Sequence, residues 1–300
     1  MFQETRILFY HAVSPVHMGA GTAVGGLIDN PIQRERHTGH PLFAGSGLKG
    51  ALRDHLKGRG WEDGKNGKLT LIFGPDTNAA HEHAGAVAFT DAQLLLFPIR
   101  SLRQAFVYAT SPTALARARR ILAMAGADPG WQLPRVEEGR ALTASKRVLV
   151  DGQLVLEAFT FAATAEEGVK NIGAWLAEGA FPTGASGFSF FAEKVKHDLV
   201  LLSDQDFTHF VETGTVVEPH VRIKDETGTA DEGGLFYTEN LPPESVMIGA
   251  FLASKARRDG DGTSAKEIAE ELHQALDGEL VQIGGDATTG RGQVVLRVVG

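Results

Sequence analysis

The side chains best suited to chemistry lie in a glycine-rich segment near the start of the chain, residues 15–50, PVHMGAGTAVGGLIDNPIQRERHTGHPLFAGSGLKG. His17 and Asp29 offer an imidazole and a carboxylate, and Arg34 and Arg36 add fixed positive charge. Glycine permits positive φ angles and lets a backbone approach a ligand closely. Glycines beside charged side chains therefore indicate a loop folded around a ligand, with Asp29 near its centre.

Asp29 and His17 each allow two interpretations. Asp29 could cap a turn, since Asp-Asn-Pro is a turn signature, or it could bind a hard cation through its oxygen atoms. His17 could make one backbone hydrogen bond in a loop, or it could transfer protons near neutral pH. Residue type alone leaves these alternatives open.

A phosphate site is predicted where a helix over residues 47–57 begins. Backbone N–H groups at a helix start bind phosphate, and basic side chains on the helix add charge. The pattern is not a Walker loop, because Lys49 is followed by Gly50 and not by Ser or Thr. The alternative is an ordinary amphipathic helix with a solvated basic face. The groups concerned are Gly45, Ser46 as the N-cap, Gly47, Lys49 and Arg53.

Composition restricts the class of protein. The 300 residues are 43% hydrophobic, enough for a buried core, and include no cysteine, which excludes disulfides and thiolate metal sites. Residues 1–59 carry seven Lys or Arg against four Asp or Glu, a balance of +3, while the other 241 residues carry 22 against 33, a balance of −11. The cationic part thus coincides with the glycine-rich part. Because no apolar run approaches about 20 residues, we expect a cytoplasmic protein without membrane contact.

Hydrophobic periodicity predicts an α+β fold, with residues 6–13 forming a strand buried on both faces. The predicted helices cover 47–57, 112–125 after the Ser111 cap, and two segments with capping boxes, Thr164-Glu167 to Gly179 and Ser264-Glu267 to Gly278. The predicted strands cover 69–73, 87–91, 94–97 before Pro98, 105–109, 147–150, 154–161, 280–283 and 293–299, with Asp151-Gly152 as a hairpin turn. This order fits a ferredoxin-like core with long insertions.

We expect one domain over residues 1–300 that carries two insertions. Residues 58–85 form an irregular insertion, and residues 215–240 form a second one. Within the second, 218–224 and 235–239 are predicted to pair as a hairpin around the acidic tip DETGTADEGG. Such an arm is too polar at its end to be core, so we expect it to reach outward.

The run HMGAGTAVGGLIDNPIQRERHTGHPLFAGSGLKGALR, residues 17–53, closely resembles a known family. The family is subunit four of the Cmr complexes, the repeated backbone subunit of type III-B CRISPR RNA-guided effectors, which belongs to the RAMP proteins. Three shorter matches follow in the same order: FTDAQLLLFPIRS with FVYATSP, LFYTENLPPES, and IGGDATTGRGQV. The resemblance runs from the first strand to the last, with little contribution from 126–215.

The resemblance implies an RRM-like (ferredoxin-like) palm with finger-like insertions and a protruding β-hairpin thumb. It also implies partners: a CRISPR guide RNA, a complementary target RNA, further copies of the chain and other Cmr subunits. Each copy is expected to cut target RNA once, with a divalent metal (Mg²⁺ or Mn²⁺), where a neighbouring thumb displaces a base pair. Guide pairing would read the sequence, and the protein would read shape and backbone.

The resemblance assigns the catalytic role and metal binding to Asp29. His17, Asp91 and Glu239 match supporting groups of the family. A single carboxylate is enough for RNA cleavage, because the 2′-hydroxyl is a built-in nucleophile that needs only orientation and charge stabilisation. The groups expected to contact RNA are Arg34, Arg36, Gly45, Ser46, Gly47, Lys49, Arg53, Arg222 on the thumb stem, and Gly284, Gly285, Thr288, Thr289 and Arg291 of the last glycine loop.

Two other functions are open from the sequence. The first keeps the RNA filament and makes Asp29 structural, so that the chain binds RNA without cutting it. The second is a stand-alone metal phosphodiesterase that uses His17, Asp29 and His37. Each candidate side chain also has a plain interpretation, such as a long hairpin turn for Gly284 and its neighbours.

Overall fold

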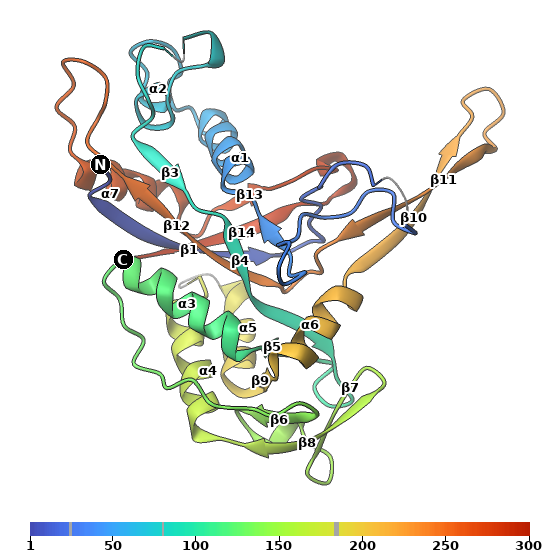
Figure 1. Ribbon diagram of the computed structural model, residues 1–300. Coiled ribbons are helices and arrows are strands. Elements are labelled where there is room, and N and C mark those ends of the chain that lie inside the picture. The colour runs from blue at the N-terminus through green and yellow to red at the C-terminus, as the bar shows by residue number, and fades with distance from the viewer. Residues whose placement is uncertain (24–25, 80, 183–185) are drawn as a thin grey trace.

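The computed structural model describes residues 1–23, 26–79, 81–182 and 186–300 (Figure 1). Residues 24 and 25 of the glycine-rich run and residue 80 of the predicted 58–85 insertion lie outside the described part. Among the described residues, no helix is both long and apolar enough to cross a membrane.

Six elements form the palm of the molecule. Strand β1 pairs with β12 and β14, and β12 pairs with β4, so the sheet order is β14-β1-β12-β4 with every pair antiparallel. Together with α1 and α7 the chain order is βαββαβ, the ferredoxin-like arrangement, which confirms the predicted fold class. The elements are β1 (Glu4–Ala12), α1 (Gly45–Gly58), β4 (Ala92–Arg100), β12 (Val246–Ala253), α7 (Ala265–Leu276) and β14 (Gln293–Val299).

Strand β1 is buried on both faces, as its alternation predicts. Leu8 and Tyr10 join the core that also contains Leu48 of α1 and Leu272 of α7. Ile7 and Phe9 belong to a second core, on the other face of the strand. A strand without a solvent face anchors whatever follows it, and the glycine loop follows directly.

A large lobe is inserted between β4 and β12. Its strands continue the palm sheet in the order β5-β9-β6-β8-β7, and Figure 1 shows its helices grouped below the palm. One sheet therefore runs through palm and lobe, and the single domain over residues 1–300 stays a prediction. The elements are β5 (Phe106–Thr110), α3 (Pro112–Met124), β6 (Arg140–Thr143), β7 (Gln153–Leu156), β8 (Phe159–Ala165), α4 (Glu167–Gly179), α5 (Ser186–Asp198), β9 (Leu199–Leu202) and α6 (Asp204–Thr213).

Two further features leave the palm. The thumb, β10 (Val216–Ile223) and β11 (Ala230–Asn240), is a separate two-stranded sheet that projects away from the palm (Figure 1), as the hairpin prediction expects. The region before β4 holds α2 (Lys68–Phe73) and β3 (Val87–Phe89), which pairs with β12. Two short strands complete the fold, β2 (Leu42–Phe43) and β13 (Leu280–Gln282).

Several predicted strands differ from the structure. Residues 69–73 are the buried helix α2, because a short apolar run fits a buried helix as well as a strand. Pro98 does not end its strand: it pairs with Tyr108 of β5, in the part of β4 beyond its pairing with β12, where a missing N–H is tolerated. Residues 146–148 form a 3₁₀ helix in place of a strand over 147–150.

The hairpin at Asp151-Gly152 forms, but only as a tight turn between Val150 and Gln153. The predicted strand 154–161 breaks into β7 and β8 at Glu157, whose φ of +51° reverses the chain.

Helix caps follow the sequence in two places and depart from it in two. Ser264 and Glu267 form the predicted capping box of α7, and the side chain of Ser111 caps α3. Thr164 lies within β8, so the box predicted for α4 is wrong. Ser46 is not an N-cap either. Helix α1 begins at Gly45, two residues before the predicted start, and its N-cap is Ala44.

Candidate functional site

The glycine loop, residues 15–41 between β1 and β2, runs along one edge of the thumb strand β11. Val16 bridges Leu241, and Asn30 bridges Thr238. The other edge of β11 pairs with β10. The loop therefore acts as a third, irregular strand at the root of the thumb.

Asp29 is exposed and is held against β11. Its Oδ2 atom accepts a hydrogen bond from the main-chain N–H of Tyr237 at 2.8 Å. In return the carbonyl oxygen of Tyr237 accepts from the N–H groups of Asp29 (3.2 Å) and Asn30 (3.0 Å). The carboxylate is thus fixed at one side while it faces solvent. Nothing in the sequence marks Tyr237, because only its backbone takes part.

His17 is bound to the same strand two residues further along. Its Nδ1 atom lies 2.7 Å from the carbonyl oxygen of Glu239, and the ring is half-buried. The N–H of Glu239 donates to the carbonyl oxygen of Asn30 at 3.0 Å, so Tyr237 and Glu239 both turn their backbone groups to the glycine loop. Two residues of a strand span about 7 Å. Asp29 and His17 therefore approach one stretch of the thumb root.

The carboxylate of Glu239 is buried, with 3% of the residue exposed. It accepts from the backbone N–H of Ile32 (3.0 Å), from Arg34 (2.5 Å) and from the hydroxyl of Thr215 (2.8 Å). A buried carboxylate with these three donors connects the glycine loop to both strands of the thumb at its root. This geometry supports a positioning role for Glu239.

Arg34 is engaged inside the protein. Besides Glu239, its guanidinium donates to the carbonyl oxygens of Gly39 (2.6 Å) and Val211 (3.4 Å). Arg36 differs, because its side chain is exposed in the same loop. Of the two arginines, Arg36 is therefore the one placed to meet a phosphate.

Asp91 lies at the start of α1. Its Oδ1 atom accepts from the backbone N–H of Gly45 at 2.7 Å, and its negative charge faces the positive end of the helix dipole. A Cβ atom on Gly45 would lie 2.4 Å from the carbonyl oxygen of Phe89, so only glycine fits there. Asp91 uses one donor of the predicted phosphate site, whereas Ser46 and Gly47 stay exposed.

The basic face of α1 turns toward β3 and the 58–85 insertion. Lys49 donates to the carbonyl oxygen of Val87 at 3.1 Å, and burial, reinforced by nearby Arg53 and Arg257, lowers its pKa. Arg53 donates to the carbonyl oxygen of Gly74 (2.7 Å) and pairs with two carboxylates of the insertion. Arg53 thus braces the insertion against α1, and Lys49 contacts β3.

The terminal loop, residues 283–292 between β13 and β14, packs against the glycine loop. The N–H of Gly285 donates to the carbonyl oxygen of His17 at 2.9 Å. Thr288 and Thr289 are exposed, while Arg291 pairs with Glu218 of the thumb. The structure therefore gathers the terminal loop, His17 and the thumb root into one region.

The thumb stem carries solvent-exposed apolar side chains. Arg222 is exposed and lies 3.9 Å from Asp231 across the hairpin. The imidazole of His220 stacks on Phe236, with ring centroids 5.2 Å apart. The exposed apolar residues of the stem are Val217, Val221, Ile223 and Leu235.

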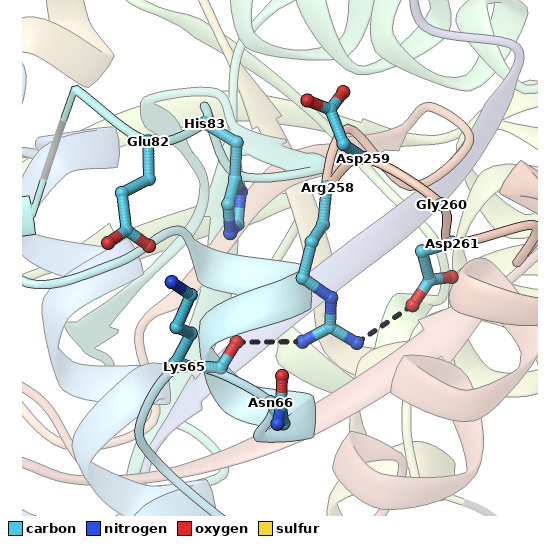
Figure 2. Close-up of a pocket in the computed structure, with 8 residues that line it drawn as sticks. All are labelled: Lys65, Asn66, Glu82, His83, Arg258, Asp259, Gly260 and Asp261. Atoms are coloured by element: carbon cyan, nitrogen blue, oxygen red, sulfur yellow. Dashed lines mark hydrogen bonds and ion pairs between the residues drawn. The ribbon is translucent and has the colours of Figure 1, made fainter.

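A cavity of about 590 Å³ lies elsewhere, between the 58–85 insertion and the loop after β12 (Figure 2). Arg258 crosses it, held by Asp261 at 2.8 Å and by the carbonyl oxygen of Lys65 at 3.1 Å. Its lining includes none of the residues that the sequence predicts for the site.

Within the described residues, no group of three or more His, Asp or Glu side chains is placed to hold a metal ion. His37 instead lies 2.9 Å from Arg117 and 3.9 Å from Glu35. Among the residues that the structure describes, His17, Asp29 and His37, which the phosphodiesterase alternative would use, thus do not form a metal centre. A metal ion beside Asp29 would have to take most of its ligands from a substrate and from water.

Comparisons with known proteins identify the family and the fold of the chain. The family model of the RAMP superfamily matches residues 9–295. The chain is 36% identical over 285 residues to the CRISPR system Cmr endoribonuclease Cmr4 of Pyrococcus furiosus, covering 95% of this chain and 92% of that protein. It is similar to the crystal structure of oligomeric Cmr4 from the same organism, with a TM-score of 0.74, 28% identity, and 99% and 98% of the two chains covered. It shares its fold with a chain of the type III-B Cmr-beta complex bound to cognate target RNA, with a TM-score of 0.71, 22% identity, and 99% and 98% covered.

Proposed function

This chain belongs to the RAMP superfamily and to the Cmr4 family within it, and from that membership we propose that it is the endoribonuclease backbone subunit of a type III-B CRISPR effector. It binds guide RNA as a helical filament and cleaves complementary target RNA at regular intervals through Asp29. The observation that carries this proposal is the exposed Asp29 carboxylate, fixed to the thumb root beside His17.

The proposed chemistry uses the 2′-hydroxyl of the target RNA as the nucleophile. The hydroxyl gives its proton to a base, its oxygen bonds to the adjacent phosphorus, and the bond from phosphorus to the 5′-oxygen breaks, with the leaving oxygen taking a proton from water. A carbonyl oxygen can only accept, so His17 carries its proton on Nδ1, toward Glu239, and keeps Nε2 free as a base. Asp29 orients or activates the hydroxyl at its exposed oxygen. The thumb stem of a neighbouring copy displaces a base pair beside the scissile phosphodiester, so that the phosphodiester can adopt the in-line geometry.

We propose that a divalent cation, Mg²⁺ or Mn²⁺, takes part. Mg²⁺ is commonly bound by one or two carboxylates together with substrate phosphates and water, and the exposed Asp29 fits that pattern. Such an ion, when bound, stabilises the negative charge that develops on the phosphate. Asp29 would hold it only while RNA is present.

The proposed partners are guide RNA, target RNA, further copies of the chain and other Cmr subunits, in the cytoplasm. RNA binding falls to groups that remain exposed, at the start of α1, in the glycine loop, on the thumb and in the terminal loop. These groups are Arg36, Ser46, Gly47, Arg222, Gly284, Gly285, Thr288 and Thr289. A chain with a formal charge of −8 can bind RNA when such groups gather along one groove.

Substitution of Asp29 tests the proposal in a complex reconstituted with guide RNA and a complementary target. Asp29→Asn should leave assembly and target binding intact and lower the cleavage rate by at least about a hundredfold. Asp128→Asn, which removes an exposed carboxylate of the lobe, is the matched control. Undiminished cleavage by Asp29→Asn would refute a catalytic role for Asp29 and favour the alternative in which this carboxylate is structural. Chelation of divalent ions should stop cleavage by the native chain, and added Mn²⁺ should restore it.

A further inference from the structure

The terminal loop is attached to the glycine loop through its backbone. The N–H of Gly292 donates to the carbonyl oxygen of Pro15 at 2.8 Å, and the N–H of Gly285 donates to that of His17 at 2.9 Å. Gly284 has a φ of +81°, and a Cβ atom there would lie 2.3 Å from the carbonyl oxygen of His17. This close approach requires glycine, so the terminal loop is held in a fixed position against the backbone of His17.

The other end of the terminal loop reaches the thumb. The guanidinium of Arg291 donates to the carboxylate of Glu218 on β10, and the same oxygen lies 3.4 Å from the amide of Asn240 on β11. The side chains of Arg291 and Glu218 are only 23% and 29% exposed. The backbone oxygen of Arg291 is fixed in turn by Gln282 at 2.9 Å. Glu218 thus neutralises the charge that a phosphate would otherwise meet.

The thumb needs such an attachment. A two-stranded hairpin is marginally stable alone, and the direction of this one depends on the contacts at its root. The glycine loop holds the β11 side through Asp29, Asn30 and His17, while Arg291 contacts a side chain of β10. The hairpin is therefore held on both strands by segments that also position the candidate catalytic groups.

We propose that Arg291 and Glu218 form a thumb latch, an ion pair that sets the direction of the thumb relative to Asp29 and His17. Arg291 is then a positioning residue and not a phosphate ligand. The inference rests on the proposed function, because each thumb is expected to displace a base pair at the cleavage site of a neighbouring copy, and its direction from the palm decides where it meets the RNA. A thumb freed at β10 would present the target RNA in several positions.

A charge-reversal cycle in the reconstituted complex tests the latch. Arg291→Glu and Glu218→Arg should each lower the cleavage rate by about ten- to a hundredfold and spread the cleavage positions. The double variant R291E/E218R should recover to within about threefold of the native rate. The salt dependence of guide-RNA binding should stay unchanged, because no phosphate contact is lost.

Opposite results would identify Arg291 as an RNA ligand. In that case Arg291→Glu and Arg291→Gln would weaken guide binding and reduce the slope of log affinity against log salt by about 0.7. Glu218→Arg would not slow cleavage, and the double variant would not recover. Any of these three results overturns the latch.

The reversal of another ion pair is the control. Arg258 and Asp261 lie 2.8 Å apart with similar exposure, in the cavity of Figure 2 away from the thumb. Their exchange, R258D/D261R, should leave the cleavage positions unchanged. A shift in those positions would mean that any disturbed ion pair affects the thumb, and would also overturn the latch.

A measurement without cleavage separates this inference from the proposed function. The chain contains no cysteine, so spin labels can be placed at Thr229→Cys on the thumb tip and Asp54→Cys on α1. The native pair should give one narrow distance distribution, Arg291→Gln should broaden it, and R291E/E218R should narrow it again. An unchanged distribution in Arg291→Gln would overturn the latch even if Asp29 proves catalytic. If the distances change as expected but the native complex does not cleave RNA, only the proposed function is overturned.

Discussion

The carboxylate of Asp29 and the main-chain N–H of Tyr237 are joined by a hydrogen bond of 2.8 Å. The proposed catalytic residue is therefore attached to the strand that carries the thumb, and not only to its own loop. Any movement of β11 moves Asp29 with it. The position of the thumb and the position of the carboxylate are therefore coupled. Substitutions at several residues around this junction should have measurable effects on cleavage or stability.

Gly19→Ala should block the free nitrogen of His17. A Cβ atom on Gly19 would lie 2.9 Å from His17 Nε2, the atom proposed to accept the proton. If His17 acts as a base, the cleavage rate should fall by about a hundredfold while the free energy of unfolding changes by less than about 1 kcal/mol. Single-turnover cleavage and denaturant unfolding measure the two effects. Native cleavage rates in this variant would remove His17 from the mechanism.

Glu239→Ala should destabilise the thumb root, because it leaves Arg34 partly buried without its carboxylate. We expect a loss of about 2–4 kcal/mol in the free energy of unfolding, together with a large loss of cleavage. Arg34→Ala should have a similar effect, and the double variant should cost clearly less than the sum of the two. Additive losses in urea unfolding would show that the two side chains are not coupled.

Asp91→Ala should remove the cap of α1 and lower the free energy of unfolding by about 1 kcal/mol. Asp91→Asn keeps an oxygen for the N–H of Gly45 and should restore most of that stability. If the only role of the carboxylate is to accept this hydrogen bond from α1, Asp91→Asn should cleave at nearly the native rate. Cleavage that disappears in Asp91→Asn at native stability would instead assign Asp91 to the chemistry.

Gly284→Ala and Gly290→Ala form a matched pair. Both positions have a φ of +81°, but only a Cβ on Gly284 meets another atom, whereas nothing lies within 4 Å at Gly290. Gly290→Ala should cost about 1–2 kcal/mol from backbone strain alone. Gly284→Ala should cost more, and it should also slow cleavage because it displaces His17. Equal losses of stability and of cleavage rate in the two variants would show that the contact between Gly284 and His17 contributes nothing to either.

Glu244, in the turn after the thumb, should make stability depend on pH. Burial raises the pKa of Glu244 to about 7 in the folded protein, although the hydrogen bond from Tyr108 opposes that rise. The folded state thus holds a proton that the unfolded chain loses near pH 4.5, so stability falls as pH rises from about 4.5 to about 7. Glu244→Gln should abolish this decline, which we expect to amount to about 1–3 kcal/mol. Denaturant unfolding of both proteins from pH 4.5 to pH 8 tests it, and parallel curves would contradict it.

The amino-acid sequence determined the parts of this protein that depend on local order. The alternation in residues 6–13 produced a strand buried on both faces, and Ser264 with Glu267 produced a capped helix. The arm of residues 216–240 formed where its pattern placed it. The glycine-rich run around Asp29 also identified the loop on which the proposed chemistry depends. These signals lie within a few residues of the structure that they specify.

Only the tertiary structure decided which charged groups remain available. Arg34, Asp91 and Arg291 look equally free in the sequence, yet each is neutralised or bonded by a partner far along the chain: Glu239, Gly45 and Glu218. Lys49 and Arg53 are likewise engaged, Lys49 by a carbonyl oxygen of β3 and Arg53 by the 58–85 insertion. Asp29 keeps an exposed carboxylate because its one partner in β11 is a backbone group that cannot neutralise its charge. Charge pairing depends on distance in space, which the order of residues along the chain does not state.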